Sequence, residues 1–221
     1  MARLQFGVWA ISFGGGIALS DLPKAVVFDV GRVLFHWQLR ALFQKLIDDE
    51  AKLDWFLTNV ISEEWHFQHD RGVPLAEMLP SRIAQYPEHA LLIAAYAARF
   101  NETVPGPVDG VHALVERLHR RSIPLFCLTN FGAELFEQFR REQPIFQCFD
   151  DVIVSGEEKV AKPEPRIYEI VERRSGFSGN QLFFTDDNSI NVTAASERGW
   201  HAHVFTSASA LEMQLRGLGL L

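Results

Sequence analysis

The stretch Lys24-Ala25-Val26-Val27-Phe28-Asp29-Val30-Gly31 decides the fold of this chain. Its apolar part is a short run of β-branched and aromatic residues, which predicts a fully buried strand. A carboxylate directly after such a strand is costly unless it has a partner or a use. Asp29 is therefore a candidate nucleophile for covalent catalysis, and the alternative is a side chain that caps the turn before Gly31.

A second segment repeats this arrangement of an apolar run followed by polar residues. Residues 123–128 predict another buried strand, and Thr129 and Asn130 follow it. Their hydroxyl, amide and nearby backbone N–H groups could hold a phosphate. The alternative is a simple helix cap.

A third segment places a lysine at the start of a helix. Lys162 precedes Pro163 and Pro165, and proline favours the first helical turn, so we expect a helix from Pro163 to Arg174. Lys162 could stabilise a transferring phosphoryl group. The alternative is a solvated surface lysine.

In the fourth segment, residues 181–185 predict a strand that ends in Asp186 and Asp187. Adjacent carboxylates repel each other unless a cation is near, and hard oxygen ligands of this kind suit Mg²⁺. The alternative is an acidic helix start. Because open α/β sheets bind ligands at the carboxyl ends of their strands, we expect all four segments to meet there.

The remaining pattern predicts an α/β protein: a three-layer α/β/α, Rossmann-like parallel sheet with an inserted helical cap. Strands are expected at 152–154 and 201–205, and helices at 108–121, 133–141, 189–198 and from 207. Residues 39–100 instead show helical spacing of apolar residues. We therefore divide the chain into an N-terminal extension at 1–21, a core at 22–37 and 105–221, and a helical cap at 38–104.

The four segments, in this order, resemble the haloacid dehalogenase superfamily from about Lys24 to the C-terminus. Within it the chain looks most like phosphatases of the alpha-D-glucose-1-phosphate phosphatase type. The matching motifs are Asp29-Val30-Gly31-Arg32-Val33, Lys162-Pro163-Glu164-Pro165-Arg166-Ile167-Tyr168, and Asp186-Asp187-Asn188 followed by Asn191.

The resemblance implies a role for each of these positions. Asp29 would attack phosphorus, and Lys162 would orient it and offset negative charge. Thr129 and the N–H groups around Asn130 would bind the phosphoryl oxygens. Mg²⁺ would be held by ligands from two motifs, which are Asp29, the Gly31 carbonyl, Asp186 and, directly or through water, Asp187.

The chain departs from the usual phosphatase pattern at two positions. Most members carry a second Asp, as general acid and base, where Gly31 stands, although the sugar-phosphate group shares this glycine. Leaving-group protonation must then come from another group, or the substrate must have a good leaving group. His36 stands where that group often has an Asp, and it could exchange protons near neutral pH or have a structural role.

The cap is expected to determine substrate specificity, because the core supplies only phosphate chemistry. A cluster near a predicted helix end contains Trp65, His66, His69, Asp70 and Arg71. Trp65 could stack on a sugar face, and Arg71 or His69 could bind hydroxyls or phosphate. The alternative is that Trp65 belongs to the cap core and the charged residues face water.

Composition excludes several other classes. The net charge of −7 at pH 7 argues against a nucleic-acid partner, and no stretch is long and apolar enough to span a bilayer. The two cysteines show no metal-binding spacing, and we expect reduced thiols in a cytoplasmic protein. The sequence does not specify an oligomeric state.

Together these features predict a Mg²⁺-dependent phosphatase of a small phosphorylated metabolite, with a sugar phosphate expected. One alternative is a dehalogenase that attacks carbon without a metal, which the Asp186-Asp187 pair disfavours. The other is a catalytically silent module that binds a phosphorylated ligand; Gly31 favours it, and Asp29, Lys162 and Asp186 disfavour it.

Overall fold

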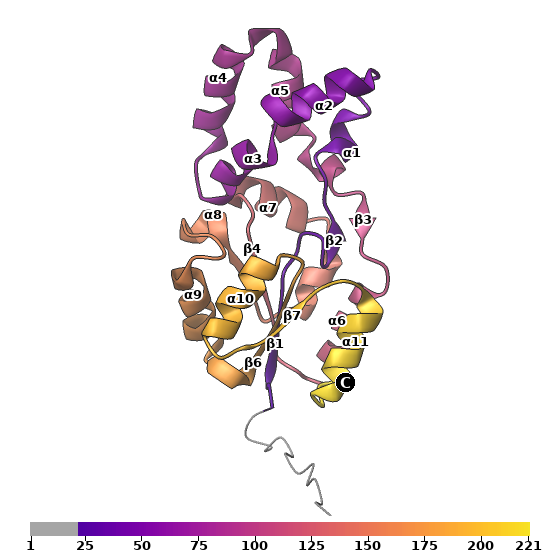
Figure 1. Cartoon of the computed structure of the whole chain (residues 1–221), viewed down its shortest axis with the longest axis vertical. Coiled ribbons are helices and arrows are strands. Elements are labelled where there is room, and N and C mark those ends of the chain that lie inside the picture. Colours follow the sequence, from indigo (N-terminus) through magenta and orange to yellow (C-terminus); the bar gives the residue numbers. More distant parts are fainter. Residues whose placement is uncertain (1–21) are drawn as a thin grey trace, which may run out of the picture.

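The computed structural model describes residues 22–221, so the extension predicted at residues 1–21 lies outside the described part of the chain. A five-stranded sheet forms its centre, in the order β5-β4-β1-β6-β7 (Figure 1). Every neighbouring pair in this sheet is parallel. The strands are β1 (Ala25–Phe28), β4 (Leu125–Thr129), β5 (Asp151–Val154), β6 (Leu182–Asp186) and β7 (His201–Val204).

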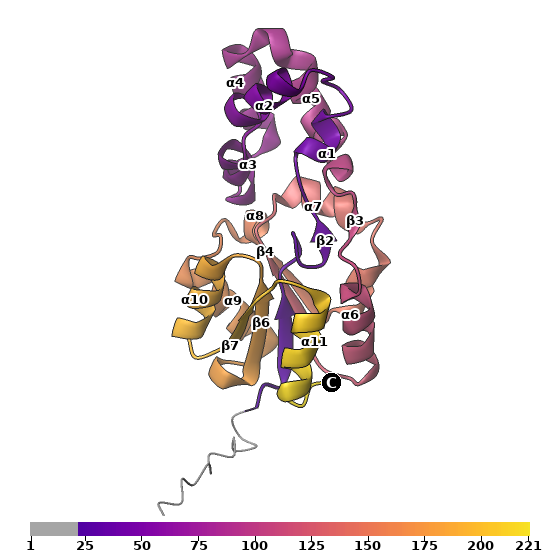
Figure 2. The same cartoon turned by 45° about the vertical axis from the view of Figure 1, so that its right-hand side comes forward.

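Helices cover both faces of this sheet, which confirms the predicted three-layer α/β fold (Figure 2). Successive residues of β1 point to opposite faces. Val26 and Phe28 pack in one apolar cluster with α6 (Val111–Arg120), α7 (Ala133–Arg140) and α11 (Ala208–Gly217). Ala25 and Val27 pack in the other, with α9 (Pro165–Ser175) and α10 (Ser189–Glu197).

A group of helices lies at the end of the molecule that adjoins the carboxyl ends of the strands (Figure 1). The chain enters and leaves it through an antiparallel ribbon of β2 (Phe35–His36) and β3 (Gly106–Pro107). We call the helices between these strands the cap helices: α1 (Arg40–Phe43), α2 (Glu50–Asn59), α3 (Glu63–Asp70), α4 (Leu75–Gln85) and α5 (Ala90–Ala98). The boundaries at 37/38 and 104/105 stay a prediction.

Several short elements complete the described chain. Helix α8 (Ser155–Glu158) follows β5 directly. Single 3₁₀ turns lie at η2 (Pro87–His89), η3 (Phe100–Thr103), η4 (Pro144–Cys148) and η5 (Gly179–Gln181). Both cysteines are free thiols.

The structure differs from the sequence-based expectations in a few places. The helix expected from Pro163 begins at Pro165, because Glu164 keeps an extended backbone and forms the N-cap. Within residues 39–100, where the apolar spacing predicts helices, two large apolar side chains are exposed: Trp55 at 46% and Leu91 at 88%. Apolar spacing marks one face of a helix, but it does not show whether another element covers that face.

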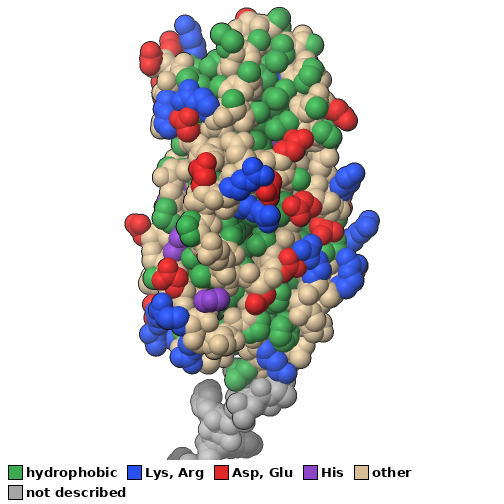
Figure 3. Space-filling model, turned by 180° about the vertical axis from the view of Figure 1, so that it is seen from behind, with side chains coloured by type: hydrophobic (Ala, Val, Ile, Leu, Met, Phe, Trp, Pro, Cys, Tyr) green, Lys and Arg blue, Asp and Glu red, His purple; other side chains and the backbone are tan. Residues whose placement is uncertain are grey.

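The surface of the described residues is mixed in charge. Figure 3 shows basic and acidic side chains interspersed on the back of the molecule. No helix within residues 22–221 is long and apolar enough to cross a membrane.

Candidate active site

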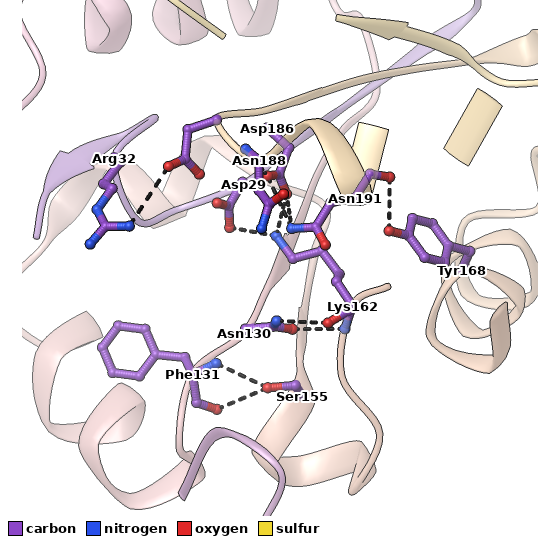
Figure 4. A network of polar contacts seen from close by, with 11 residues as sticks. Asp29, Arg32, Asn130, Phe131, Ser155, Lys162, Tyr168, Asp186, Asn188 and Asn191 are labelled. Carbon is purple, nitrogen blue, oxygen red and sulfur yellow. Dashed lines mark hydrogen bonds and ion pairs between the residues drawn. The ribbon is translucent and has the colours of Figure 1, made fainter. Parts of the chain in front are cut away.

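The four polar segments meet at the carboxyl edge of the sheet, beside the cap helices (Figure 4). Asp29 follows the central strand β1, which pairs with β4 on one side and β6 on the other. Thr129 and Asp186 are the last residues of those two neighbours. Lys162 reaches the same edge from the loop before α9.

Lys162 lies buried between two carboxylates. Its Nζ is 2.7 Å from Asp29 Oδ1 and 2.6 Å from Asp186 Oδ2. Burial alone would lower the pKa of the ammonium group, but Asp186 and Asp29 outweigh it and raise that pKa above its ordinary value. Lys162 therefore stays charged and fixes the orientation of Asp29.

The carboxylates outnumber this single ammonium group. Ligand oxygens of Asp29, Asp186 and Asp187 lie within 4.8 Å of one another. Burial raises the pKa of Asp29 to about 7, Asp186 and Asp187 add to the rise, and Lys162 opposes it. Burial and Asp186 likewise raise the pKa of Asp187. A hard divalent cation among these oxygens would offset the excess negative charge, so the donor set fits Mg²⁺.

Hydrogen bonds from Asn191 and Asn188 also hold the Asp186 carboxylate in place, in addition to the Lys162 ion pair. Asn191 Nδ2 donates to both of its carboxylate oxygens, at 3.1 and 3.0 Å. The backbone N–H of Asn188 donates to Oδ1 at 2.8 Å. These bonds fix the carboxylate at the start of α10, where the helix dipole favours negative charge.

Asn130 positions the loop that carries Lys162. Its amide Nδ2 donates to the Lys162 carbonyl at 3.0 Å, and its Oδ1 accepts from the Lys162 N–H at 2.8 Å. The side chain thereby joins the end of β4 to the loop before α9. Thr129 is buried beside it at the strand end.

A tight turn after Asp29 directs Arg32 toward the cap helices. Arg32 has a left-handed backbone with φ of 60°, and its N–H donates to the Phe35 carbonyl at 2.7 Å. Its guanidinium lies 2.6 Å from Glu63 on α3 and 4.0 Å from Asp187. Arg32 therefore bridges the acidic cluster of the sheet edge and the cap helices.

One cavity joins the sheet edge to the cap helices. Its charged end includes Asp29, Lys162 and Asp187, with Gly31 beside them. Its other walls mix aromatic and polar side chains, and the large aromatic side chains that line it are Phe35, Trp37, Phe67, Phe100, Phe131 and Phe139. The cavity therefore combines one charged end with walls that are partly aromatic.

Two residues of the predicted cap cluster also line this cavity, namely His66 and Asp70. The His66 ring stacks on Trp37, with ring centroids 4.9 Å apart, and on Phe100 at 5.8 Å. Both polar side chains are buried, so they lie within the aromatic wall rather than in solvent.

Other predicted residues are not among those that line the cavity, and three of them have different surroundings. His36 is exposed on β2. Trp65 is buried in the cap against Tyr96, with ring centroids 5.1 Å apart. Arg71 ends α3 and forms an ion pair with Glu164 at 2.9 Å.

Sequence reasoning gave no separate role to Arg32 or Glu63, which also line the cavity. Arg32 belongs to the first motif. Its left-handed backbone conformation directs the side chain to the cavity, and no sequence pattern predicts that conformation. Glu63 opens a helix in the insert, where an acidic residue is expected for helix-dipole reasons alone.

The fold and the site define a hydrolase of the α/β class with a strand-end aspartate. The chain belongs to the haloacid dehalogenase-like hydrolase family, whose model matches residues 23–199. This confirms the predicted superfamily and an enzymatic role. The finer likeness to alpha-D-glucose-1-phosphate phosphatases stays a prediction.

Similar proteins include both phosphatases and dehalogenases. The chain is 28% identical over 197 residues to the sesquiterpene phosphatase astK of Aspergillus oryzae, covering 88% of this chain and 96% of that one. It is 30% identical to an (S)-2-haloacid dehalogenase of Pseudomonas putida, but over only 39% of this chain and 38% of the dehalogenase.

Solved structures show the same fold. A haloacid dehalogenase family enzyme from Bacteroides thetaiotaomicron matches with a TM-score of 0.67 and 20% identity, over 88% of this chain and 98% of that one. That enzyme has also been crystallised with magnesium and inorganic phosphate; this form matches with a TM-score of 0.62 and 21% identity, over 84% of this chain and 95% of that one.

Proposed function

We propose that this protein is a Mg²⁺-dependent phosphatase that works through an aspartyl-phosphate on Asp29. The observation that carries this proposal is the placement of Asp29, with its Oδ1 2.7 Å from the Lys162 ammonium and its carboxylate beside Asp186 and Asp187. A buried nucleophile with an adjacent cation, beside a donor set for a hard metal, is the arrangement that phosphoryl transfer requires.

The residues divide the reaction between them. Asp29 attacks phosphorus and forms the covalent intermediate, which water then hydrolyses. Lys162 holds the attacking carboxylate in place and offsets charge on the phosphoryl oxygens. Thr129 and the N–H groups near Asn130 bind those oxygens. Mg²⁺, held by Asp29, the Gly31 carbonyl, Asp186 and Asp187, would supply further charge neutralisation.

For the organic part of the substrate, the six large aromatic side chains of the cavity wall can bury an apolar group, in place of the sugar expected from the sequence. A sugar hydroxyl buried without a hydrogen-bond partner costs free energy, whereas each buried CH₂ gains about 0.8 kcal/mol. The relative astK is a sesquiterpene phosphatase and matches over nearly its whole length. We therefore propose the monophosphate of an apolar alcohol, such as an isoprenoid.

Phosphate release from farnesyl monophosphate, glucose 1-phosphate and p-nitrophenyl phosphate tests this proposal, with Mg²⁺ and with excess EDTA. We expect kcat/KM for farnesyl monophosphate to exceed that for glucose 1-phosphate by about tenfold or more, which corresponds to about 1.4 kcal/mol. EDTA should abolish turnover of all three. A preference for glucose 1-phosphate would restore the sugar-phosphate hypothesis.

A dehalogenase remains the second candidate, because (S)-2-haloacid dehalogenases match part of the chain. In that reaction Asp29 would attack carbon and no metal would be needed. Halide release from a 2-haloacid in excess EDTA, without phosphatase activity, would favour it. A chain without either activity would be the phospho-ligand-binding module. The cytoplasmic location and the absence of nucleic-acid and membrane partners stay predictions.

A further inference from the structure

Among residues 22–221, the carboxylates of the sheet edge are assigned to the nucleophile and the proposed metal site, so none of them is left as an acid for the leaving group. Asp29 is committed to the attack on phosphorus, and the position two residues later is Gly31. Lys162 is held between two carboxylates that keep it charged. A poor leaving group such as an alkoxide requires a proton, and a positioned acid is worth roughly 10² to 10⁴ in rate.

We propose that Asp70, at the end of cap helix α3, is this acid, and therefore a catalytic residue of the phosphatase reaction. This inference rests on the proposed function. Asp70 is only 5% exposed, yet it lines the cavity that contains Asp29 and Lys162. Its Oδ1 is buried and has no hydrogen-bond partner among the described residues. A buried, unpartnered carboxyl oxygen at a cavity wall is free to bond a ligand.

The surroundings of Asp70 favour its protonated form. Burial raises the pKa of its carboxyl group to about 7, opposed by His69, by a hydrogen bond from the Gly132 N–H and by Lys162. The other titratable groups near it are His66, Tyr96 and, through His69, Glu134. A carboxyl group with this pKa can give and regain a proton near neutral pH.

His66 can accommodate Asp70 in both of its protonation states. Its Nε2 lies 3.4 Å from Asp70 Oδ1, and its Nδ1 lies 2.5 Å from the Tyr96 hydroxyl. Burial lowers the pKa of His66 to about 3, so the ring is neutral and one nitrogen donates while the other accepts. Nε2 and Oδ1 form no hydrogen bond in this structure, so the proton of the Asp70 acid is left for a ligand. After that proton has been transferred, the tautomer with Nε2–H can donate to the Asp70 carboxylate. The Tyr96 hydroxyl can likewise donate or accept.

In the proposed reaction, Asp70 gives a proton to the leaving group in the first half and regains one from water in the second. Asp29 forms a bond to phosphorus while the bond between phosphorus and the leaving oxygen breaks, and its electron pair stays on that oxygen. The Asp70 carboxyl proton moves to the leaving oxygen, which gives the free alcohol and an Asp70 carboxylate. In the second half, the water oxygen bonds to phosphorus while the bond between phosphorus and the Asp29 oxygen breaks, with its electron pair left on Asp29, and one water proton moves to Asp70. Phosphate, Asp29 and the Asp70 acid result.

The test is the leaving-group dependence of kcat/KM, which reports the reaction up to formation of the aspartyl-phosphate. Asp70→Asn keeps the shape of the side chain and removes its proton. We expect a loss of about 10²-fold or more on alkyl monophosphates, but of at most about threefold on p-nitrophenyl phosphate, whose leaving group needs no proton. Glu63→Gln removes another cavity carboxylate and should keep the leaving-group dependence of the parent protein.

A measurement on the parent protein avoids any folding defect of the variant. The ratio of kcat/KM for an alkyl phosphate to that for p-nitrophenyl phosphate should fall as pH rises through about 7, because only the alkyl substrate requires the protonated acid. Effects on Asp29 cancel in this ratio. Equal slowing of all substrates by Asp70→Asn, no slowing, or a pH-independent ratio would overturn the assignment. A parent protein without phosphatase activity would instead overturn the proposed function.

Discussion

Asp29 combines two properties in one residue: it is the nucleophile of the proposed reaction and a buried carboxylate beside two others. We predict that Asp29→Asn lowers phosphatase kcat by at least about 10³-fold, or about 4 kcal/mol of barrier, because an amide cannot form the aspartyl-phosphate. The fold should persist, since the substitution relieves repulsion with Asp186 and Asp187.

Phosphate release and circular dichroism of Asp29→Asn check this prediction. The control is Asp109→Asn, purified in the same way, which removes an exposed carboxylate outside the cavity. Turnover of Asp29→Asn at the rate of this control would contradict a covalent mechanism on Asp29.

A second prediction concerns the position of Lys162, which the Asn130 side chain fixes, rather than the chemistry of the reaction. Asn130→Ala removes both bonds to the backbone of Lys162 and leaves an N–H and a carbonyl without those partners. We expect a loss of about 1–3 kcal/mol in the free energy of unfolding, measured in urea. Phosphatase activity should fall as well, because Lys162 loses its fixed approach to Asp29. A variant with unchanged stability would show that water replaces both bonds.

The individual site residues could be predicted in part. Asp29, Thr129, Lys162 and Asp186 follow apolar runs or open a helix, and parallel strands bring such positions to one edge. The cap residues could not be predicted in this way. Which face of α3 meets the sheet edge depends on packing between elements distant in sequence, so the sequence did not separate Asp70 and His66 from Trp65 and Arg71.

Among the elements, the contact of α3 with the loop before α7 is especially close. A Cβ added at Gly132 would overlap the ring of His69, although the Gly132 backbone, with φ of −67°, is open to alanine. We expect Gly132→Ala to destabilise the fold by about 1–3 kcal/mol and to reduce activity by displacing α3.

A double-mutant cycle in urea isolates this contact. His69→Ala removes the overlapping ring, so Gly132→Ala should cost much less in that background, with a coupling energy of about 1–2 kcal/mol. Equal costs of Gly132→Ala in both backgrounds would mean that the loss arises elsewhere, for example in the backbone of the loop.

The helices and strands with the clearest local sequence pattern were predicted most accurately. The buried strands and the core helices α6, α7, α10 and α11 were expected within a few residues of their bounds. In α6 and α7 the buried apolar residues recur at helical spacing, which makes the pattern easy to recognise. Helix α4 lies inside the predicted helical region, but the apolar spacing did not mark it separately; the structure uses Pro74 as its N-cap and keeps Pro80 inside the helix. The ribbon of β2 and β3 is too short to show any periodicity.

At the scale of the whole molecule, a cation that binds only the folded chain stabilises all of it. With Mg²⁺ at about 100 times its Kd, the gain is about 2.7 kcal/mol, or roughly 5–10 °C in Tm for a chain of this length. We expect Asp186→Asn to lose this shift and Asp109→Asn to keep it, in thermal melts with Mg²⁺ and with EDTA. A shift of equal size in both variants would place the cation elsewhere.

The central place of β1 in the sheet also concerns the nascent chain. Among the described strands this one leaves the ribosome before the others, yet its neighbours β4 and β6 follow roughly 100 and 150 residues later. At about 5–20 residues per second, the two edges of an Ala-Val-Val-Phe strand stay unpaired for about 5–20 s and 8–30 s respectively. Unpaired apolar edges invite aggregation, so we expect a chaperone that shields β1 during synthesis to raise the yield of folded protein.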